Sequence, residues 1–236
     1  IEDDLLNLSK SLEKPATDRY LSPVGRPRTG PSFRWYRIHI NGRFRDILPA
    51  VMMHVAAEAW KFNDGKVRIG VPVDLRSRRN GLRSTGNLTN AIFFNIDKTT
   101  TIETLADQIR QRLDQKNDGV LTWEDNLIRF IPVSVLKHVL SCEEKKSAGT
   151  NLYRYSGIIS NLGKMPLDIF SAGTFRASSV FFIPPGNGLT PLFITMQGNT
   201  EGLDIIMTIP AGSLSDKEAG LFLKRISELP GAKNAG

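Results

Sequence analysis

The sequence is poor in cysteine and in long apolar runs, and both shortages narrow what the protein can be. Because Cys142 is the only cysteine, the chain can form no internal disulfide, which is compatible with a reducing cytoplasm. No stretch approaches the roughly 18 apolar residues of a membrane span, and no charged-then-apolar signal peptide opens the sequence. We therefore expect a cytoplasmic protein with no membrane span.

Histidine is equally scarce, and several catalytic patterns are missing. The three histidines, His39, His54 and His138, are never adjacent, and no grouping of His, Cys and Asp has metal-ligand spacing. The sequence also lacks a Gly-x-Ser-x-Gly elbow and a phosphate-binding Gly-Lys-Ser/Thr loop, and Cys142 has no histidine beside it. We expect no metal site, and we expect His54 to be a partly buried structural residue of a helix.

What the chain has in excess is positive charge. Its 236 residues include 31 Lys and Arg against 24 Asp and Glu, a formal net charge of +7 at pH 7. Such a charge suits an anionic partner, whether nucleic acid, a membrane surface, a phosphorylated cofactor or an acidic carrier protein. Nucleic-acid binding would require basic residues interleaved with aromatic ones on a sheet, or a recognition helix. The nearest pattern, Arg34 to Arg37, is better explained as packing on a strand, so we expect no nucleic-acid partner.

Hydrophobic periodicity predicts an α/β (α+β) sandwich, a mixed β-sheet with helices packed on its faces. Apolar alternation or short apolar runs predict strands at residues 33–40, 67–73, 91–96, 155–160, 173–183, 191–196 and 203–209. Helical periodicity predicts helices at residues 46–60, 100–113, 122–140 (one or two short ones) and 215–229. Thr100 with Glu103, and Ser215 with Glu218, have the spacing of capping boxes. Residues 143–148 are charged and small, and we expect a loop there.

The first 32 residues differ in composition from the rest of the chain. Residues 1–13 have partly periodic leucines and are predicted to end a helix, and residues 14–32 hold four prolines and two glycines, as an extended linker does. We therefore divide the chain into 1–32, a helix remnant and linker, and 33–236, one folded lobe. A linker that follows a helix remnant leads us to expect a folded segment before it.

An arginine-rich loop separates the two most regular predicted strands, within Val67–Ile96. It carries Arg76, Arg78, Arg79 and Arg83. Because these cations repel one another, an anion nearby would stabilise them. Two interpretations stay open, a solvated basic loop and an anion-binding site, and composition favours neither.

A second stretch, Tyr155–Gly163, ends in the short polar side chains Ser160 and Asn161. The succession VPVDLR, STGNLTN and ISNLG resembles the C-terminal lobe of condensation-domain-like acyltransferases over roughly residues 33–230. This superfamily includes chloramphenicol acetyltransferase and peptide-synthetase condensation domains, and the most similar branch is that of the alcohol acetyltransferases and polyketide-associated acyltransferases. The resemblance implies a single lobe of the chloramphenicol-acetyltransferase-like fold.

The resemblance also implies which groups do the chemistry. The family's general base is the second His of His-His-x-x-x-Asp, which this sequence lacks, so the base is expected on an N-terminal lobe. Ser160 and Asn161 would line the opposite wall of the tunnel and donate to the oxyanion of a tetrahedral intermediate. The alternative, that both satisfy backbone groups where the strand ends, is equally open.

Donor binding is expected in the arginine-rich loop. A tight turn there would present N–H groups to a pantetheine arm or a phosphate, and the arginines would add charge. The predicted donor-binding residues are Arg76, Arg78, Arg79, Thr85, Gly86 and Asn87. A structural role is favoured for two residues of this region, with Asp74 as an arginine partner or loop cap and Arg76 as a structural ion-pair partner.

These observations lead to one main hypothesis and two alternatives. The chain would be the C-terminal lobe of an acyltransferase that moves an acyl group from coenzyme A or a carrier-protein thioester to an alcohol or amine. It would be inactive alone, would bind acyl-coenzyme A or a phosphopantetheine thioester as substrate and no tight cofactor, and would pair with an N-terminal lobe. An exposed apolar face could also support a homodimer. The alternatives are a non-catalytic binding or assembly module of the same fold and a basic nucleic-acid-binding domain.

Overall fold

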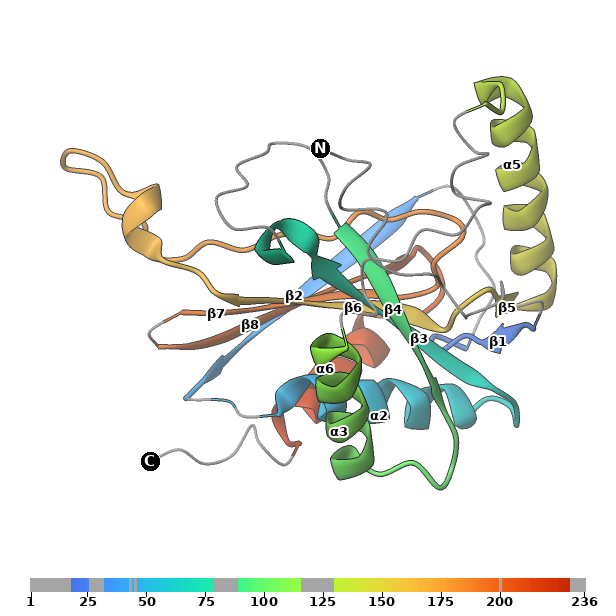
Figure 1. Cartoon of the computed structure of the whole chain (residues 1–236), viewed down its shortest axis with the longest axis horizontal. Helices are drawn as coiled ribbons and strands as arrows, with labels where there is room; N and C mark the ends of the chain where they lie inside the picture. The colour runs from blue at the N-terminus through green and yellow to red at the C-terminus, as the bar shows by residue number, and fades with distance from the viewer. Residues whose placement is uncertain are drawn as a thin grey trace.

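A six-stranded mixed β-sheet organises the described part of the chain (Figure 1). The computed structural model describes residues 18–25, 32–42, 44, 46–78, 89–115, 130–199 and 201–229. The strands lie in the order β2–β8–β7–β6–β3–β4, and β6 runs parallel to both of its neighbours while all other pairs are antiparallel. Their bounds are β2 Phe33–Asn41, β3 Val67–Asp74, β4 Thr89–Ile96, β6 Gly157–Lys164, β7 Phe193–Gly198 and β8 Gly202–Pro210.

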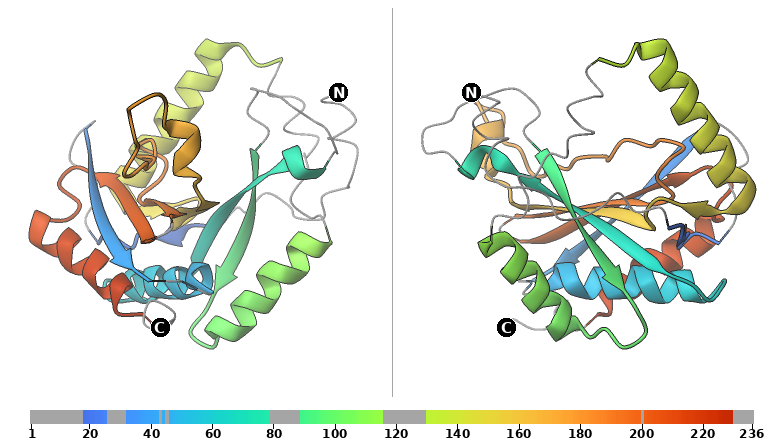
Figure 2. Two further views of the ribbon diagram at one scale, coloured as in Figure 1. Left: turned by 90° about the vertical axis from the view of Figure 1, so that its left-hand side faces the viewer. Right: turned by 45° about the vertical axis from the view of Figure 1, so that its right-hand side comes forward.

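Three helices cover one face of this sheet (Figure 2). They are α2 (Ile47–Trp60), α3 (Ile102–Asp114) and α6 (Asp216–Ser227). The strand residues that point toward them are apolar and fully buried, as at Ile69, Ile159 and Ile205. The predicted α+β sandwich with helices packed on a mixed sheet is therefore confirmed.

The other face of the sheet is lined with polar side chains on its central and β2-side strands. Because side chains alternate along a strand, the neighbours of the buried apolar residues point away from the helices. We call this surface the polar face, and it is defined by Arg37, His39, Ser160, Thr195, Gln197 and Asp204.

A two-stranded sheet adds part of the predicted linker to the folded body. β1 (Tyr20–Leu21) pairs antiparallel with β5 (Leu152–Tyr153). Tyr20, Leu21 and Val24 are all buried. The expectation of an extended linker is thus wrong for these residues, because their apolar side chains contribute to the core. The predicted helix at residues 1–13 lies outside the described residues.

Helix α5 (Val133–Thr150) replaces the predicted loop at residues 143–148 and stands beside the sheet (Figure 1). The charged stretch stays helical because Glu143 pairs with Arg19 and lies 3.6 Å from Nε of Arg154, while Ser147 is buried against the body. The helix ends at Asn151, whose φ of 53° is left-handed. Among the described residues, no helix combines the length and apolar character needed to cross a membrane.

The strand expected at residues 173–183 is absent, and this prediction is wrong. Apart from an isolated bridge between Ala172 and Phe175, the segment is irregular and lies on the polar face. Its backbone bonds to side chains of the sheet, since the N–H of Phe182 donates to Oε1 of Gln197 and Oγ1 of Thr195 donates to the Phe182 carbonyl, at 3.1 and 2.7 Å. The apolar residues of the segment therefore reflect packing on a sheet and not membership of one.

The predicted capping box of α6 is confirmed, and that of α3 forms one residue later than predicted. Ser215 and Glu218 form the predicted capping box of α6. In α3 the box forms one residue later than predicted, between Thr101 and Thr104. The reason is that Thr100 is held in the preceding turn, where its hydroxyl accepts the N–H of Asp97 at 3.1 Å.

Candidate functional site

Ser160 lies in the middle of the sheet, on the polar face. Its strand β6 sits between β3 and β7, and its direct neighbour on β7 is Thr195. The Ser160 residue is only 9% exposed, and within the described part of the chain its hydroxyl has no hydrogen-bond partner. A hydroxyl without a protein partner can donate to a reacting oxygen atom, and the role of Ser160 as an oxyanion donor stays a prediction.

Asn161 differs from Ser160 in both orientation and role. Its exposed side chain accepts the N–H of Gly163 through Oδ1 at 3.0 Å. Gly163 has a φ of +69°, and the pairing of β6 with β7 shifts register between Asn161 and Lys164. The strand therefore does not end at Ser160, as the sequence predicted, but continues through a bulge that Asn161 caps. This contact matches the structural alternative for Asn161.

A buried carboxylate also lies on the polar face. Asp204 on β8 is 1% exposed and accepts hydrogen bonds from Nε of Arg37 at 2.9 Å and Nδ1 of His39 at 3.2 Å, both on β2. Next to it on β7, Gln197 is buried, and its Nε2 has no partner among the described residues. Sequence reasoning missed this cluster, although an aspartate inside the apolar run of β8 was a signal of a paired charge.

The three histidines lie in three different elements of the fold. His39 lies on β2 and bonds to Asp204 of β8, and His54 of α2 is buried with its ring 4.9 Å from that of Phe222. Burial lowers the pKa of His54, although Glu58 raises it in part. The predicted position of His54, buried in a helix, is confirmed. His138 lies on exposed α5, where the helical turn brings its Nε2 to 3.6 Å from Sγ of Cys142, a proximity that the sequence analysis overlooked.

The arginine-rich loop begins in a 3-10 turn, η1 (Leu75–Arg78), directly after β3. Asp74 accepts both the backbone N–H and the Nη1 of Arg76 at 3.0 Å, so it is an arginine partner and a loop cap at once. The side chain of Arg78 and the predicted donor-binding residues Arg79, Thr85, Gly86 and Asn87 lie outside the described residues. Their roles stay predictions.

The sheet topology brings the predicted oxyanion residue Ser160 and the arginine-rich loop to the same end of the sheet. β3 and β6 are parallel neighbours, with Ile69 paired to Gly157. Ser160 near the middle of β6 and Arg76 after the end of β3 therefore lie toward the same end of adjacent strands. An acyl group near Ser160 and an anion near the start of the arginine-rich loop would both be within reach of this end.

These features define the class of fold. The chain has the α+β fold of condensation domains and chloramphenicol-acetyltransferase-like acyltransferases. The scan against protein-family models gives no match, and neither does the search of the curated proteins. The fold assignment therefore rests on similarity between structures.

Three solved structures illustrate the likeness. The condensation domain of the Monacolin K polyketide synthase MokA matches with a TM-score of 0.55 and 11% identity, over 95% of this chain and 50% of that one. TRI3 trichothecene 15-O-acetyltransferase from Fusarium sporotrichioides gives 0.51 and 11%, over 86% and 48%. The epimerization domain of tyrocidine synthetase B, third module, gives 0.50 and 13%, over 96% and 53%. The chain spans about half the length of each of these proteins. Because one of them is an epimerization domain, the fold by itself does not define the reaction.

Proposed function

We propose that this chain is the C-terminal lobe of an acyltransferase that uses coenzyme A or a carrier-protein thioester as acyl donor and an alcohol or amine as acceptor. The observation that carries the proposal is the similarity of almost the whole chain to about half of a condensation domain. An N-terminal lobe would supply the missing half together with the general base, since His-His-x-x-x-Asp is absent from this sequence. We expect the intact protein in the cytoplasm.

In the proposed reaction Ser160 stabilises negative charge. The acceptor oxygen or nitrogen attacks the thioester carbonyl and loses its proton to the base of the other lobe, and the carbonyl oxygen becomes an oxyanion. The hydroxyl of Ser160 donates to that oxyanion. When the tetrahedral intermediate collapses, the carbon–sulfur bond breaks and the thiolate takes up the proton. The arginine-rich loop, from Arg76 onward, would hold the donor phosphates.

Two variants of the two-lobed protein separate this role from a structural one. Ser160→Ala is expected to lower turnover by about a hundredfold or more, with little change in substrate binding, because an oxyanion donor acts in the transition state. Asn161→Ala is expected to lower the free energy of unfolding by about 1 kcal/mol and to leave the turnover of folded protein unchanged. Normal turnover of Ser160→Ala would remove Ser160 from the site.

The isolated chain provides a second test. Incubated with acetyl-coenzyme A and short alcohols, it is expected to release no free thiol, because none of its histidines is expected to act as the base. Turnover that His54→Ala or His138→Ala abolishes would contradict the assignment of the base to another lobe.

Two observations support an alternative function, a non-catalytic binding or assembly module. They are the use of Asn161 as a bulge cap and the absence of a base motif from this sequence. The coding sequence upstream of Ile1 distinguishes the two. A His-His-x-x-x-Asp motif there supports the enzyme, and a start codon directly before Ile1 supports the module. In the module, the exposed apolar side chains of α5, such as Val133 and Val139, would be candidates for a homodimer interface.

A further inference from the structure

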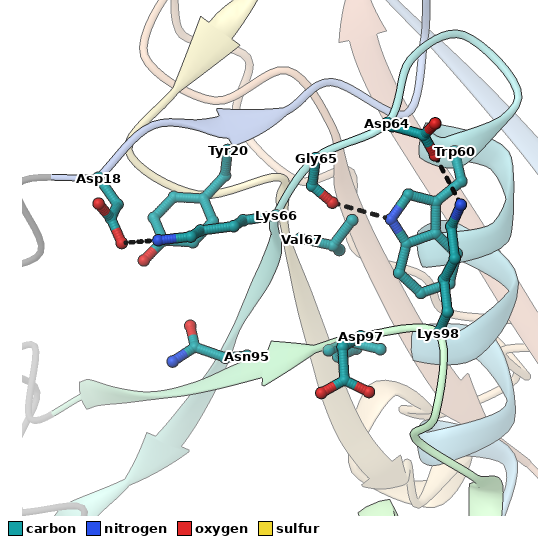
Figure 3. Close-up of a pocket in the computed structure, with 11 residues that line it drawn as sticks. Asp18, Tyr20, Trp60, Asp64, Gly65, Lys66, Val67, Asn95, Asp97 and Lys98 are labelled. Atoms are coloured by element: carbon teal, nitrogen blue, oxygen red, sulfur yellow. Dashed lines mark hydrogen bonds and ion pairs between the residues drawn. The ribbon is translucent and has the colours of Figure 1, made fainter.

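A pocket opens where β3 begins, but the groups that line it are engaged with one another (Figure 3). Nζ of Lys66 lies 2.7 Å from Oδ2 of Asp18. Nζ of Lys98 lies 2.6 Å from Oδ1 of Asp64. The ring of Tyr20 is buried, with only 3% of the residue exposed. These lysines and this ring are therefore not free to hold a ligand.

Two metal-ligating side chains on α5, His138 and Cys142, are free in this sense. Both residues are exposed. Because they are four residues apart on a helix, their side chains are neighbours on its surface. Nε2 of His138 lies 3.6 Å from Sγ of Cys142. Within the described part of the chain, neither side chain has another hydrogen-bond or ion-pair partner, so both atoms are available to a third atom.

The distance between Sγ and Nε2 is the distance found across a chelated zinc ion. Zinc binds thiolate sulfur at about 2.3 Å and imidazole nitrogen at about 2.0–2.1 Å, usually in tetrahedral geometry. These bond lengths and the tetrahedral angle place the two ligand atoms about 3.5–3.6 Å apart. The observed 3.6 Å therefore lets one ion bind both atoms while α5 keeps its conformation. Zinc-binding His-Glu-x-x-His motifs use the same spacing of four residues on a helix.

Apolar side chains flank the pair on α5. Val135 and Val139 precede His138 and Cys142 by three residues each, so each valine lies one turn before a ligand on the same side of the helix. The two valines are 50% and 53% exposed. An apolar surrounding limits the access of water to a metal ion. The valines therefore favour binding by the sulfur and nitrogen atoms over hydration of the ion.

The charged residues nearby do not attract a cation. Lys145 and Lys146 lie one turn after Cys142 and repel a positive ion. Glu143 is bonded to Arg19 and so is engaged elsewhere. A thiol loses its proton when it binds a metal, and the negative sulfur then offsets part of the repulsion. Binding at this pair would consequently depend on the sulfur and nitrogen bonds and not on the charge of the surface.

We propose that His138 and Cys142 together bind one thiophilic divalent cation, Zn²⁺, per chain. Nε2 of the neutral imidazole and the thiolate Sγ bind the ion, the thiol proton passes to solvent, and water fills the remaining positions. Among the described residues, no group of three or more His, Cys, Asp or Glu could hold a metal ion, so the site has two protein ligands. The expectation of no metal site overlooked this helical pair. The binding does not depend on the proposed acyl transfer.

Zinc titration of the untagged whole chain at pH 7, followed by calorimetry, tests the proposal. We expect one ion per chain. His138→Ala and Cys142→Ser should each lower the affinity on the order of a hundredfold, the share of one ligand in a zinc site. Both residues are exposed, so both variants are expected to fold. The control is Asp107→Asn, which removes an exposed carboxylate of α3 and should leave the affinity unchanged.

Two further measurements show which atom binds the metal. Co²⁺ in place of Zn²⁺ should give the near-ultraviolet absorption band of a thiolate–metal bond, and this band should vanish in Cys142→Ser. Since Cys142 is the only cysteine, its alkylation by iodoacetamide is specific and should slow when Zn²⁺ is added. Sodium nitrate should not weaken zinc binding, because it screens the repulsion by the lysines, whereas adsorption to surface carboxylates would weaken with salt.

Four results would overturn the proposal. They are no saturable zinc binding, an unchanged affinity in either folded variant, the absence of the cobalt–sulfur band, and one ion per two chains accompanied by a dimer. If circular dichroism shows that a variant does not fold, the cobalt band and the alkylation rate of the unaltered chain decide. A rate that Zn²⁺ leaves unchanged refutes binding at Cys142.

Discussion

Replacement of Glu58 by Gln tests how α2 is fixed to α6. Glu58 lies on α2 and is only 6% exposed. Its Oε1 accepts hydrogen bonds from Nζ of Lys61 at 2.6 Å and from Nη1 of Arg225, on α6, at 2.8 Å. The contact with Arg225 therefore joins two helices that are far apart in the sequence and cover the same face of the sheet.

The loss of stability expected for Glu58→Gln depends on how exposed Lys61 and Arg225 are. A hydrogen bond to a charged group contributes about 1.5–3 kcal/mol when buried. The side chains of Lys61 and Arg225 are about half exposed, so water screens both bonds and their sum is reduced to about 2 kcal/mol. Since glutamine has nearly the same volume, we expect Glu58→Gln to lower the free energy of unfolding by this amount at pH 7.

The destabilisation caused by Glu58→Gln should also depend on pH in a definite direction. Burial raises the pKa of Glu58, but the hydrogen bonds from Lys61 and Arg225 and the charge of His54 lower it by more, so the net pKa lies below its ordinary value. A carboxyl group with a lowered folded pKa contributes stability above its unfolded pKa of about 4.3, and this stability is lost as the pH falls through the folded value. The difference between the unaltered chain and Glu58→Gln should therefore shrink only below about pH 4.3.

His54 adds a second acid-sensitive contribution at higher pH. Because burial lowers its pKa, the unfolded chain takes up a proton at His54 before the folded chain does. Both proteins should consequently lose stability as the pH falls below about 6.5, the unfolded value for histidine. Because the carboxylate of Glu58 partly raises the pKa of His54, Glu58→Gln should lose slightly more stability in this range, and the shrinking of the difference below about pH 4.3 remains specific to the Glu58 carboxyl group.

Urea unfolding at several pH values, followed by circular dichroism, measures both effects. Glu201→Gln is the control, because Glu201 is exposed in the turn before β8 and its substitution should cost less than about 0.5 kcal/mol. The reasoning is refuted if Glu58→Gln is no more destabilising than this control at pH 7, or if its full effect persists at about pH 3.

Two further predictions concern the sheet and the arginine-rich loop. A Cβ at Gly202 would lie 2.2 Å from the carbonyl oxygen of Ile40, so Gly202→Ala should separate β2 from β8 and lower the melting temperature of the protein. Gly220 lies on α6 in open space, so Gly220→Ala should stabilise the folded protein by about 0.5–1 kcal/mol in the same melting assay. Substituting both Arg78 and Arg79 by Gln should weaken the binding of acetyl-coenzyme A and its salt dependence with little change in melting temperature, and an unchanged affinity would identify the loop as solvated surface.

The sequence predicted those elements whose signal is local. Apolar alternation located β2, β3 and β8 to within about one residue at most ends, and helical periodicity located α2. Ser215 and Glu218 marked the start of α6, because a capping box needs only residues three apart. An arginine partner for Asp74 and an ion-pair role for Arg76 were predictable for the same reason, and the structure shows that the two residues pair with each other.

Features that depend on distant contacts were not predictable from local patterns. The charged end of α5 is helical because Glu143 bonds to Arg19, a residue 124 positions earlier. The buried Asp204 depends on Arg37 and His39, which are brought beside it only when β2 pairs with β8. No spacing rule connects residues whose separation is set by the order of strands in a sheet.

The candidate site shows most clearly where sequence reasoning reaches its limit. Ser160 and Asn161 are neighbours in the sequence, and because alternation along the strand was expected to point them to opposite faces, only one of the pair was expected to face the reacting carbonyl. Gly163 then takes a positive φ, and the resulting bulge uses the oxygen of Asn161 as a cap, while the hydroxyl of Ser160, a residue only 9% exposed, has no partner among the described residues. A tetrapeptide can therefore identify the strand that carries a site, but only the register of that strand decides which of its side chains is free to act.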